Sequence, residues 1–333
     1  MTTLNRLTLT ALSILVLISF SGTVSHTLSS SDLLWSKGKT MPALRLEGTG
    51  IALDGKIYYI GGMNRHEGAT NTVEVYDPRK DEWSTASPLP ERLDHPTAAT
   101  YNGKIYVVGG FNSTGHSTNF LFIYDPLTNK WEHGKNMPTP RAALAVKFVD
   151  GILYAIGGDG DIHWNERGIY NPQGVVNANE AYNPETNSWE VKAPMPTQRD
   201  HSGSALVNDK IFVIGGRQPW GGPLFKNLDK NEMYDPKSNT WSTLAPLPTN
   251  RSGISAVSFD GKIYVLGGES IHEVFNENER YDPITNTWTQ EPNMPTGRHG
   301  FAAVVIDKKI YTIAGGPDPG GDGSGTNEIF HID

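Results

Sequence analysis

The chain of 333 residues contains no cysteine. Disulfide bonds, thiolate catalysis, zinc–thiolate centres and a lipidated N-terminal cysteine are therefore all excluded. Positive charge is also scarce, with 28 lysines and arginines against 36 acidic residues and a formal net charge of -8. A surface that binds nucleic acid would need clustered basic residues, so we expect no nucleic-acid partner.

Long hydrophobic runs are limited to one, the 14 residues of Leu7–Phe20. An ordinary membrane span needs about 20 apolar residues, so this run is short for that role. The single charge before it, Arg6, and the small residues SGTVS after it are typical of a secretory signal. We predict a signal peptide over residues 1–25 and a flexible leader over 26–33. The rest of the chain is then secreted, periplasmic or at the cell surface, with no membrane span, although an uncleaved anchor is the alternative.

Glycine, proline and aromatic residues are abundant, and they recur in one phrase. Residues 260–268 read DGKIYVLGG, and the phrase returns at 54–62, 102–110, 150–158 and 208–216, and more loosely at 307–315. Six tryptophans keep step with it, each standing 26 residues before the Gly-Gly doublet or its Ala-Gly equivalent: Trp35, Trp83, Trp131, Trp189, Trp241 and Trp288. We predict that these tryptophans are structural. The length varies only between the doublet and a later in-frame Tyr or Phe, which marks that segment as a variable loop.

Each unit predicts four strands. An apolar strand leads through an Asp-Gly or Asn-Gly hairpin to the buried KIYVLGG strand, because such pairs accept positive φ angles. A third strand ends at Tyr-Asp-Pro, and the tryptophan opens the fourth. This order and a period of about 48 residues resemble the kelch repeat, which has about 50 residues per β-propeller blade. The resemblance covers residues 34–333 and implies an all-β fold, a single six-bladed kelch-type β-propeller.

The two ends of the chain predict how the ring closes. The last unit stops after its third strand, whereas one surplus tryptophan, Trp35, precedes the first unit. A strand around Leu34–Lys37 would therefore complete the sixth blade and leave no unpaired edge between blades. We expect a monomer.

Charged residues also repeat. Arginine stands ten residues after the tryptophan in five units, and glutamate stands two residues before the in-frame Tyr or Phe in the same five. The second unit replaces both, with Leu93 and Phe122. A ring of arginines would suit an anion, and kelch-type substrate adaptors hold acidic peptides in this way. The loss of both residues in the same unit instead favours an Arg–Glu pair inside each blade. Replacing only one partner would leave a buried charge unpaired, which costs about 3–5 kcal/mol.

Residues outside the repeated frame are candidates for ligand binding. Trp164 and Trp220 lie in the two longest variable loops, residues 159–178 and 217–230. Aromatic rings with arginines are typical of recognition surfaces. The alternative is that these rings pack their own loops against the propeller. Together with Arg92, which lacks a repeated glutamate partner, the predicted binding residues are Trp164, Arg167, Tyr170, Arg217, Trp220 and Phe225.

A second set of residues stands eleven and twelve positions after the tryptophan, where the innermost strand begins. It contains Asp94-His95 in the second unit, Asp200-His201 in the fourth, His299 in the sixth and Glu47 in the first. Histidines beside carboxylates can exchange protons near neutral pH. The alternative is that they are solvated or bonded to backbone at the start of a strand.

We predict a non-enzymatic, exported recognition module that binds a protein, peptide or glycan through the variable loops. No HExxH or paired-histidine spacing is present, so we expect no metal and no cofactor. The alternative is a sugar mutarotase or epimerase, since exported kelch propellers include sialic acid mutarotases. In that interpretation Asp94, His95, Asp200, His201 and His299 supply the acid and base. Arg92 would anchor the sugar carboxylate.

Overall fold

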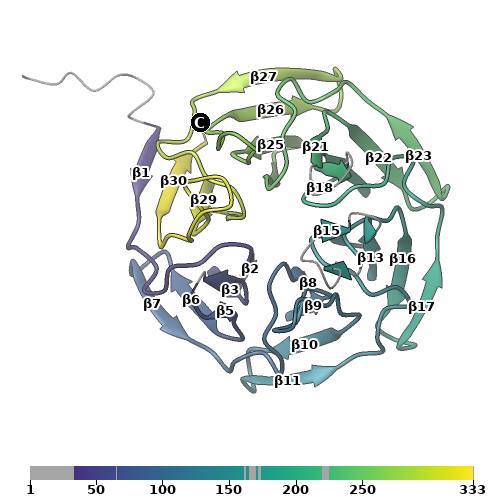
Figure 1. Ribbon diagram of the computed structural model, residues 1–333, viewed down its shortest axis with the longest axis horizontal. Helices are drawn as coiled ribbons and strands as arrows, with labels where there is room; N and C mark the ends of the chain where they lie inside the picture. The colour runs from purple at the N-terminus through teal and green to yellow at the C-terminus, as the bar shows by residue number, and fades with distance from the viewer. Residues whose placement is uncertain are drawn as a thin grey trace, which may run out of the picture.

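The computed structural model describes residues 34–64, 66–160, 163–164, 170–171, 174–219 and 225–332. In this part of the chain six four-stranded antiparallel sheets stand around a central axis as blades (Figure 1). The predicted six-bladed, all-β propeller is therefore confirmed. No helix among these residues is long and apolar enough to cross a membrane. The predicted signal peptide and leader lie outside the described residues.

Each blade runs from an innermost strand beside the axis to an outermost strand at the rim. From the inside outward, the first three blades are β2 Thr49–Leu53, β3 Lys56–Ile60, β6 Val73–Asp77 and β7 Glu82–Thr85; β8 Thr97–Tyr101, β9 Lys104–Val108, β10 Leu121–Asp125 and β11 Lys130–His133; and β12 Ala145–Val149, β13 Ile152–Ile156, β16 Asn179–Asn183 and β17 Ser188–Val191. The last three blades are β18 Gly203–Val207, β19 Lys210–Ile214, β22 Asn231–Asp235 and β23 Thr240–Thr243; β24 Ser255–Phe259, β25 Lys262–Leu266, β26 Asn278–Asp282 and β27 Thr287–Glu291; and β28 Ala302–Ile306, β29 Lys309–Ile313, β30 Asn327–His331 and β1 Trp35–Lys37.

The variable loops add short hairpins at one end of three blades. These are β4 Met63–Asn64 with β5 Gly68–Ala69, β14 His163–Trp164 with β15 Tyr170–Asn171, and β20 Arg217–Pro219 with β21 Phe225–Asn227. The four-residue core of each KIYVLGG-type strand is buried, as in β3, where Ile57, Tyr59 and Ile60 have no exposed surface. The strand is enclosed because the facing surfaces of neighbouring blades cover it on both sides.

The N-terminal strand closes the ring as predicted. β1 pairs antiparallel with β30, and Trp35 stands opposite Phe330 with ring centroids 5.1 Å apart. The Trp35 indole donates a 3.2 Å hydrogen bond to the Pro292 carbonyl of the fifth blade. The other five in-frame tryptophans make the same bond to the carbonyl four residues after the tryptophan of the preceding blade, at 2.7–3.0 Å. Trp35 thus occupies the tryptophan position of the sixth blade.

The repeated arginines are structural. All five pair with the glutamate of their own blade: Arg45 with Glu74, Arg141 with Glu180, Arg199 with Glu232, Arg251 with Glu279 and Arg298 with Glu328. Their side chains are at most 3% exposed, so they do not form an anion-binding ring on the surface. They also donate to carbonyls at the end of the buried strand, as Arg141 does to Gly157 at 3.0 Å. In the second blade the buried side chains of Leu93 and Phe122 occupy these positions.

Candidate functional site

A closed ring of backbone hydrogen bonds surrounds one mouth of the central channel. Each of its six members stands twelve residues after an in-frame tryptophan: Glu47, His95, Ala143, His201, Gly253 and Gly300. The backbone N–H of each member donates to the carbonyl of the preceding member, at 2.7–3.2 Å. All six have positive φ, between 50° and 62°. Only glycine adopts such a conformation without steric cost, so the four other residues are held in strained backbone. Strain of this kind often marks a functional position.

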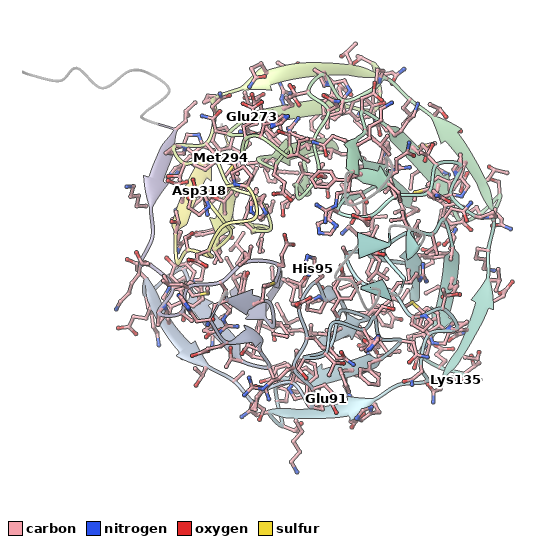
Figure 2. The ribbon with its side chains drawn as sticks, in the orientation of Figure 1. Glu91, His95, Lys135, Glu273, Met294 and Asp318 are labelled. Carbon is pink, nitrogen blue, oxygen red and sulfur yellow. The ribbon has the colours of Figure 1, made fainter. Side chains whose placement is uncertain are left out.

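The variable loops begin beside this ring. The residue before each ring member bridges to the first residue after the Gly-Gly doublet, as in Asp94 with Phe111 and Asp200 with Arg217. Loop residues therefore contact the side chains of the ring, which places these side chains on the loop face. Figure 2 shows His95 close to the axis, where the blades meet. The structure thus brings together residues that the sequence scatters over five repeats.

His95 is surrounded by carboxylates. Its Nδ1 lies 2.8 Å from Asp94 Oδ1, and its Nε2 lies 3.4 Å from Glu47 Oε2. Burial lowers the pKa of the His95 imidazole, but the Glu47 carboxylate and the hydrogen bond to Asp94 outweigh it and raise the pKa to about 9. Burial likewise opposes ionisation of Glu47, yet the neighbouring His95 and His299 hold the Glu47 pKa well below its usual range. His95 is therefore a cation at neutral pH.

His201 has the opposite protonation state. Its Nδ1 bonds to Asp200, and its Nε2 lies 3.0 Å from the Arg217 guanidinium, which also donates to Asp200 Oδ1 at 2.9 Å. Because Arg217 can only donate, His201 Nε2 must accept and the ring is neutral. Burial, together with the Arg217 charge, accordingly lowers the His201 pKa. The Arg217 guanidinium also stacks over the Phe225 ring, 4.4 Å from its centroid.

His299 completes the cluster from the sixth blade. Its Nδ1 lies 3.5 Å from Glu47 Oε1 and 3.5 Å from Glu269 Oε2, and its Nε2 lies 3.1 Å from the Asp318 carbonyl oxygen. Burial lowers its pKa, but the two carboxylates raise it above the ordinary histidine value. Arg217 also bridges to Glu269, at 3.2 Å. We call these eight residues the mouth cluster: Glu47, Asp94, His95, Asp200, His201, Arg217, Glu269 and His299.

Three members of the mouth cluster have the ligand types of a metal site. The ligating atoms of Glu47, His95 and His201 lie within 4.8 Å of one another. Their histidines also bond to Asp94 and Asp200, as metal-bound histidines usually do to a carboxylate. However, Arg217 occupies His201 Nε2. Its positive charge opposes a cation at the same point, so the side-chain arrangement does not favour a metal.

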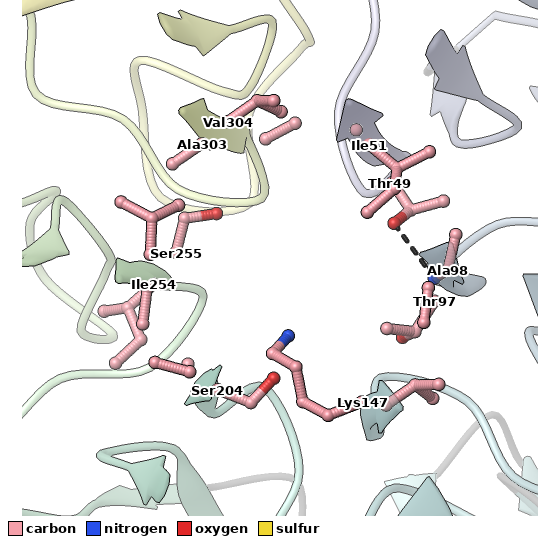
Figure 3. A pocket seen from close by; sticks show the side chains of 18 of the residues that line it. Thr49, Ile51, Thr97, Ala98, Lys147, Ser204, Ile254, Ser255, Ala303 and Val304 are labelled. Carbon is pink, nitrogen blue, oxygen red and sulfur yellow. Dashed lines mark hydrogen bonds between the residues drawn. The ribbon is translucent and has the colours of Figure 1, made fainter. Parts of the chain in front are cut away.

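Beneath the ring, the innermost strands enclose a cavity of about 450 Å³ along the axis. Its walls are small, apolar and hydroxyl-bearing side chains of all six blades. One lysine, Lys147 of β12, extends into the open centre, with the Ser204 hydroxyl of β18 beside it (Figure 3). Sequence reasoning missed Lys147, as it missed Glu269. Alignment of the innermost strands reveals Lys147, because five units have an apolar residue at its position.

The residues that the sequence predicts to bind a ligand lie in different surroundings, and some of them lie outside the described residues. Arg217 and Phe225 are partly buried, and Phe225 packs against the guanidinium of Arg217, which belongs to the mouth cluster. Arg92 is exposed and forms no ion pair within the described ranges. Trp164 pairs with Tyr170 in the backbone of the β14–β15 hairpin. Arg167 and Trp220 lie outside the described residues, so the role of this loop set stays a prediction.

Comparison with known proteins establishes the family. The sequence matches the KLHDC2/KLHL20/DRC7 Kelch-repeats domain over residues 23–216 and 171–333. The chain therefore belongs to the kelch-repeat β-propeller family. A solved structure of YjhT superposes with a TM-score of 0.74, covering 88% of this chain and 97% of YjhT at 19% sequence identity. At that identity the likeness shows the fold alone.

Among curated proteins, Kelch-like protein terF of Aspergillus terreus is 31% identical over 241 residues, which are 71% of this chain and 41% of terF. Kelch-like protein 7 of Rattus norvegicus is 35% identical over 94 residues, or 28% of this chain and 15% of that protein. The chain thus spans less than half the length of these relatives. Their similarity supports the repeat and leaves the ligand to be inferred from the site.

Proposed function

We propose that the protein is an exported recognition module that binds a protein, peptide or glycan on the loop face of the propeller, over the mouth cluster. The observation that carries this proposal is the convergence of ionisable side chains from five blades at one point of the ring. Five of the blades are already held by their own Arg–Glu pair, and all six by a tryptophan hydrogen bond. The mouth cluster is therefore additional to the framework, and variable loops surround it.

The protonation states favour binding over catalysis. Proton transfer near neutral pH works best with groups whose pKa lies close to 7. His95 instead stays protonated, with a pKa of about 9, while both nitrogens of His201 are engaged by Asp200 and Arg217. Such a preorganised set of charges suits the recognition of a polar ligand.

The test compares two surfaces of the same molecule. We would screen the chain from residue 26 onward on peptide and glycan arrays, beside a variant with Trp164→Ala and Trp220→Ala. Leu127, 92% exposed in the turn between β10 and β11 at the opposite face, provides the matched control Leu127→Ala. We expect the double variant alone to lose ligands while its melting temperature stays unchanged. Unchanged ligands in the double variant would contradict binding through these loops.

Export rests on the pattern of the first 25 residues. Expression of the full chain with a C-terminal tag, followed by mass spectrometry of the mature N-terminus, tests it. A start between residues 22 and 26 in the medium or periplasm is expected. An intact N-terminus in the cytoplasm would contradict export without affecting the loop-face proposal.

One observation favours a second function, mutarotation of a sugar. The His95 and His201 rings lie 4.9 Å apart, and each bonds to an aspartate, so a protonated and a neutral imidazole from different blades lie side by side. Addition of a single sialic acid anomer, followed by NMR, would show faster interconversion if the cluster is catalytic. A rate equal to that in buffer would eliminate this function.

A further inference from the structure

We infer that the central channel contains a binding site for a small monocarboxylate, with Lys147 as its cationic anchor. This site lies below the ring of the mouth cluster and goes beyond recognition on the loop face. It does not depend on which partner the loops bind.

The position of Lys147 in the repeat is the first observation. Lys147 is the third residue of β12 and stands opposite Tyr154 of β13. In the other innermost strands the third residue also faces an aromatic side chain, but it is always apolar: Ile51, Ala99, Ala205, Val257 and Val304. Blade packing therefore does not require a charge here, and the lysine is a departure from the framework.

The surroundings of Lys147 are the second observation. No described carboxylate pairs with its ammonium, in contrast to the repeated arginines, which all have a glutamate. An unpaired charge in a confined space costs free energy unless a ligand or water compensates it. Figure 3 shows the side chain directed into the cavity, away from the wall. The site is thus built around a positive charge that the protein leaves for a ligand.

The walls define the chemical class of the ligand. Thr97 and Ser255 donate their hydroxyls to the Leu144 and Phe301 carbonyls of the next blade, at 2.9 Å and 2.7 Å. Within the described ranges the Ser204 hydroxyl has no such bond, and it points to the same space as Lys147. A single lysine neutralises one negative charge, and the apolar wall residues suit a carbon skeleton better than a fully hydrated inorganic ion. A small hydroxy acid has one carboxylate for Lys147, a hydroxyl for Ser204 and a carbon skeleton for the apolar wall.

The test uses the full chain at pH 7 and constant ionic strength, with L-lactate as the probe and ligand-detected NMR as the readout. Lactamide is the matched neutral probe because it replaces only the carboxylate. We expect lactate to bind in the millimolar range and at least about tenfold more tightly than lactamide. Lys147→Met should remove this difference, and Ser204→Ala should weaken lactate binding a few-fold.

Three results would overturn the inference. These are equal binding of lactate and lactamide, lactate binding that survives Lys147→Met, and no lactate binding at concentrations up to tens of millimolar.

Competition separates the possible anions: phosphate or chloride that displaces lactate at lower concentration would show an inorganic-anion site instead. Lys147→Gln repeats the experiment should the methionine variant fail to fold. Arrays of loop-face ligands should give the same result for both variants, which separates this inference from the proposed function.

The pH dependence gives a further readout. Burial lowers the Lys147 pKa to about 8, so lactate affinity should fall as pH rises above that value and the ammonium loses its proton. The other ionisable groups that line the cavity in the described part of the chain are Glu47, His95 and His201. Because His95 also loses its proton near pH 9, the comparison is made against Lys147→Met at each pH. A parallel pH profile in both proteins would contradict the role of Lys147.

Discussion

Single residues at the channel mouth adopt conformations that their side chains do not favour. Glu47, His95, Ala143 and His201 have left-handed backbone, whereas the two remaining ring positions are glycine. Six mutual hydrogen bonds hold the ring in this geometry, and they keep each non-glycine member in its strained backbone conformation. Three of the four strained residues are ionisable, which argues that their side chains are retained for the mouth cluster.

Ala143 has a strained backbone but no ionisable side chain, so a substitution there tests the strain separately from the charges. Ala143→Gly should raise the free energy of unfolding by about 0.5–1 kcal/mol, because glycine adopts the φ of 50° without the steric cost. Urea denaturation measures the change. Gly253→Ala, at the equivalent position of the fifth blade, is the converse variant and should destabilise. A destabilised Ala143→Gly protein would show that the ring is not strained.

His95 should make stability depend on pH. Its folded pKa of about 9 lies above the unfolded value of about 6.5, so the stability that it contributes is fully present below pH 6.5 and is lost between pH 6.5 and 9. We expect the wild-type protein to lose about 1–3 kcal/mol over this interval relative to His95→Gln. Denaturant titrations at several pH values measure the difference. The same pH dependence in both proteins would contradict the ion pair with Glu47.

At the scale of elements, five of the six blades join their strands through a buried Arg–Glu pair. Arg141 and Glu180 link the entry to β12 with β16, and the carbonyl of Gly157 accepts from the same guanidinium. The second blade performs the same task with Leu93 and Phe122. An ion pair and an apolar pair thus fill the same position in different blades, and the second blade provides an internal comparison for the other five.

A double-mutant cycle tests this equivalence. Arg141→Leu alone should cost about 3–5 kcal/mol of unfolding free energy, because it leaves Glu180 buried without its partner. Adding Glu180→Phe reproduces the pair of the second blade and should recover most of that loss. Chemical denaturation of the four proteins gives the coupling energy. Additive losses in the double variant would contradict the equivalence.

The sequence predicted the elements well because the repeat supplies its own alignment. The fixed spacing from Trp83 to its doublet, the Asp-Gly turns and the joint loss of Arg and Glu in one unit are visible without coordinates. The mouth cluster was predicted only in pieces. Arg217 and Glu269 both stand directly after the doublet, but the six units have six different residues there, so the repeat does not indicate which of these side chains meet the ring. Lys147 lies at a framework position where only comparison of all six innermost strands makes a charge conspicuous.

At the scale of the whole molecule, the ring depends on contacts between residues far apart in the sequence. β1 and β30 come from opposite ends of the described chain, and the Trp35 indole reaches Pro292 across 257 positions. Every other blade is closed by a strand from its own repeat. Because the mouth ring needs all six blades in place, the candidate site depends on this single closure.

Removal of the closing strand is the most direct test of this account. A chain that begins after Lys37 should lose its single cooperative unfolding transition in calorimetry, since the sixth blade then has three strands and an open edge. Trp35→Ala should destabilise by about 3 kcal/mol or less, because the indole is only partly buried. Trp131→Ala, within one repeat, serves as its control. An unchanged melting curve for the shortened chain would contradict a propeller closed by its N-terminal strand.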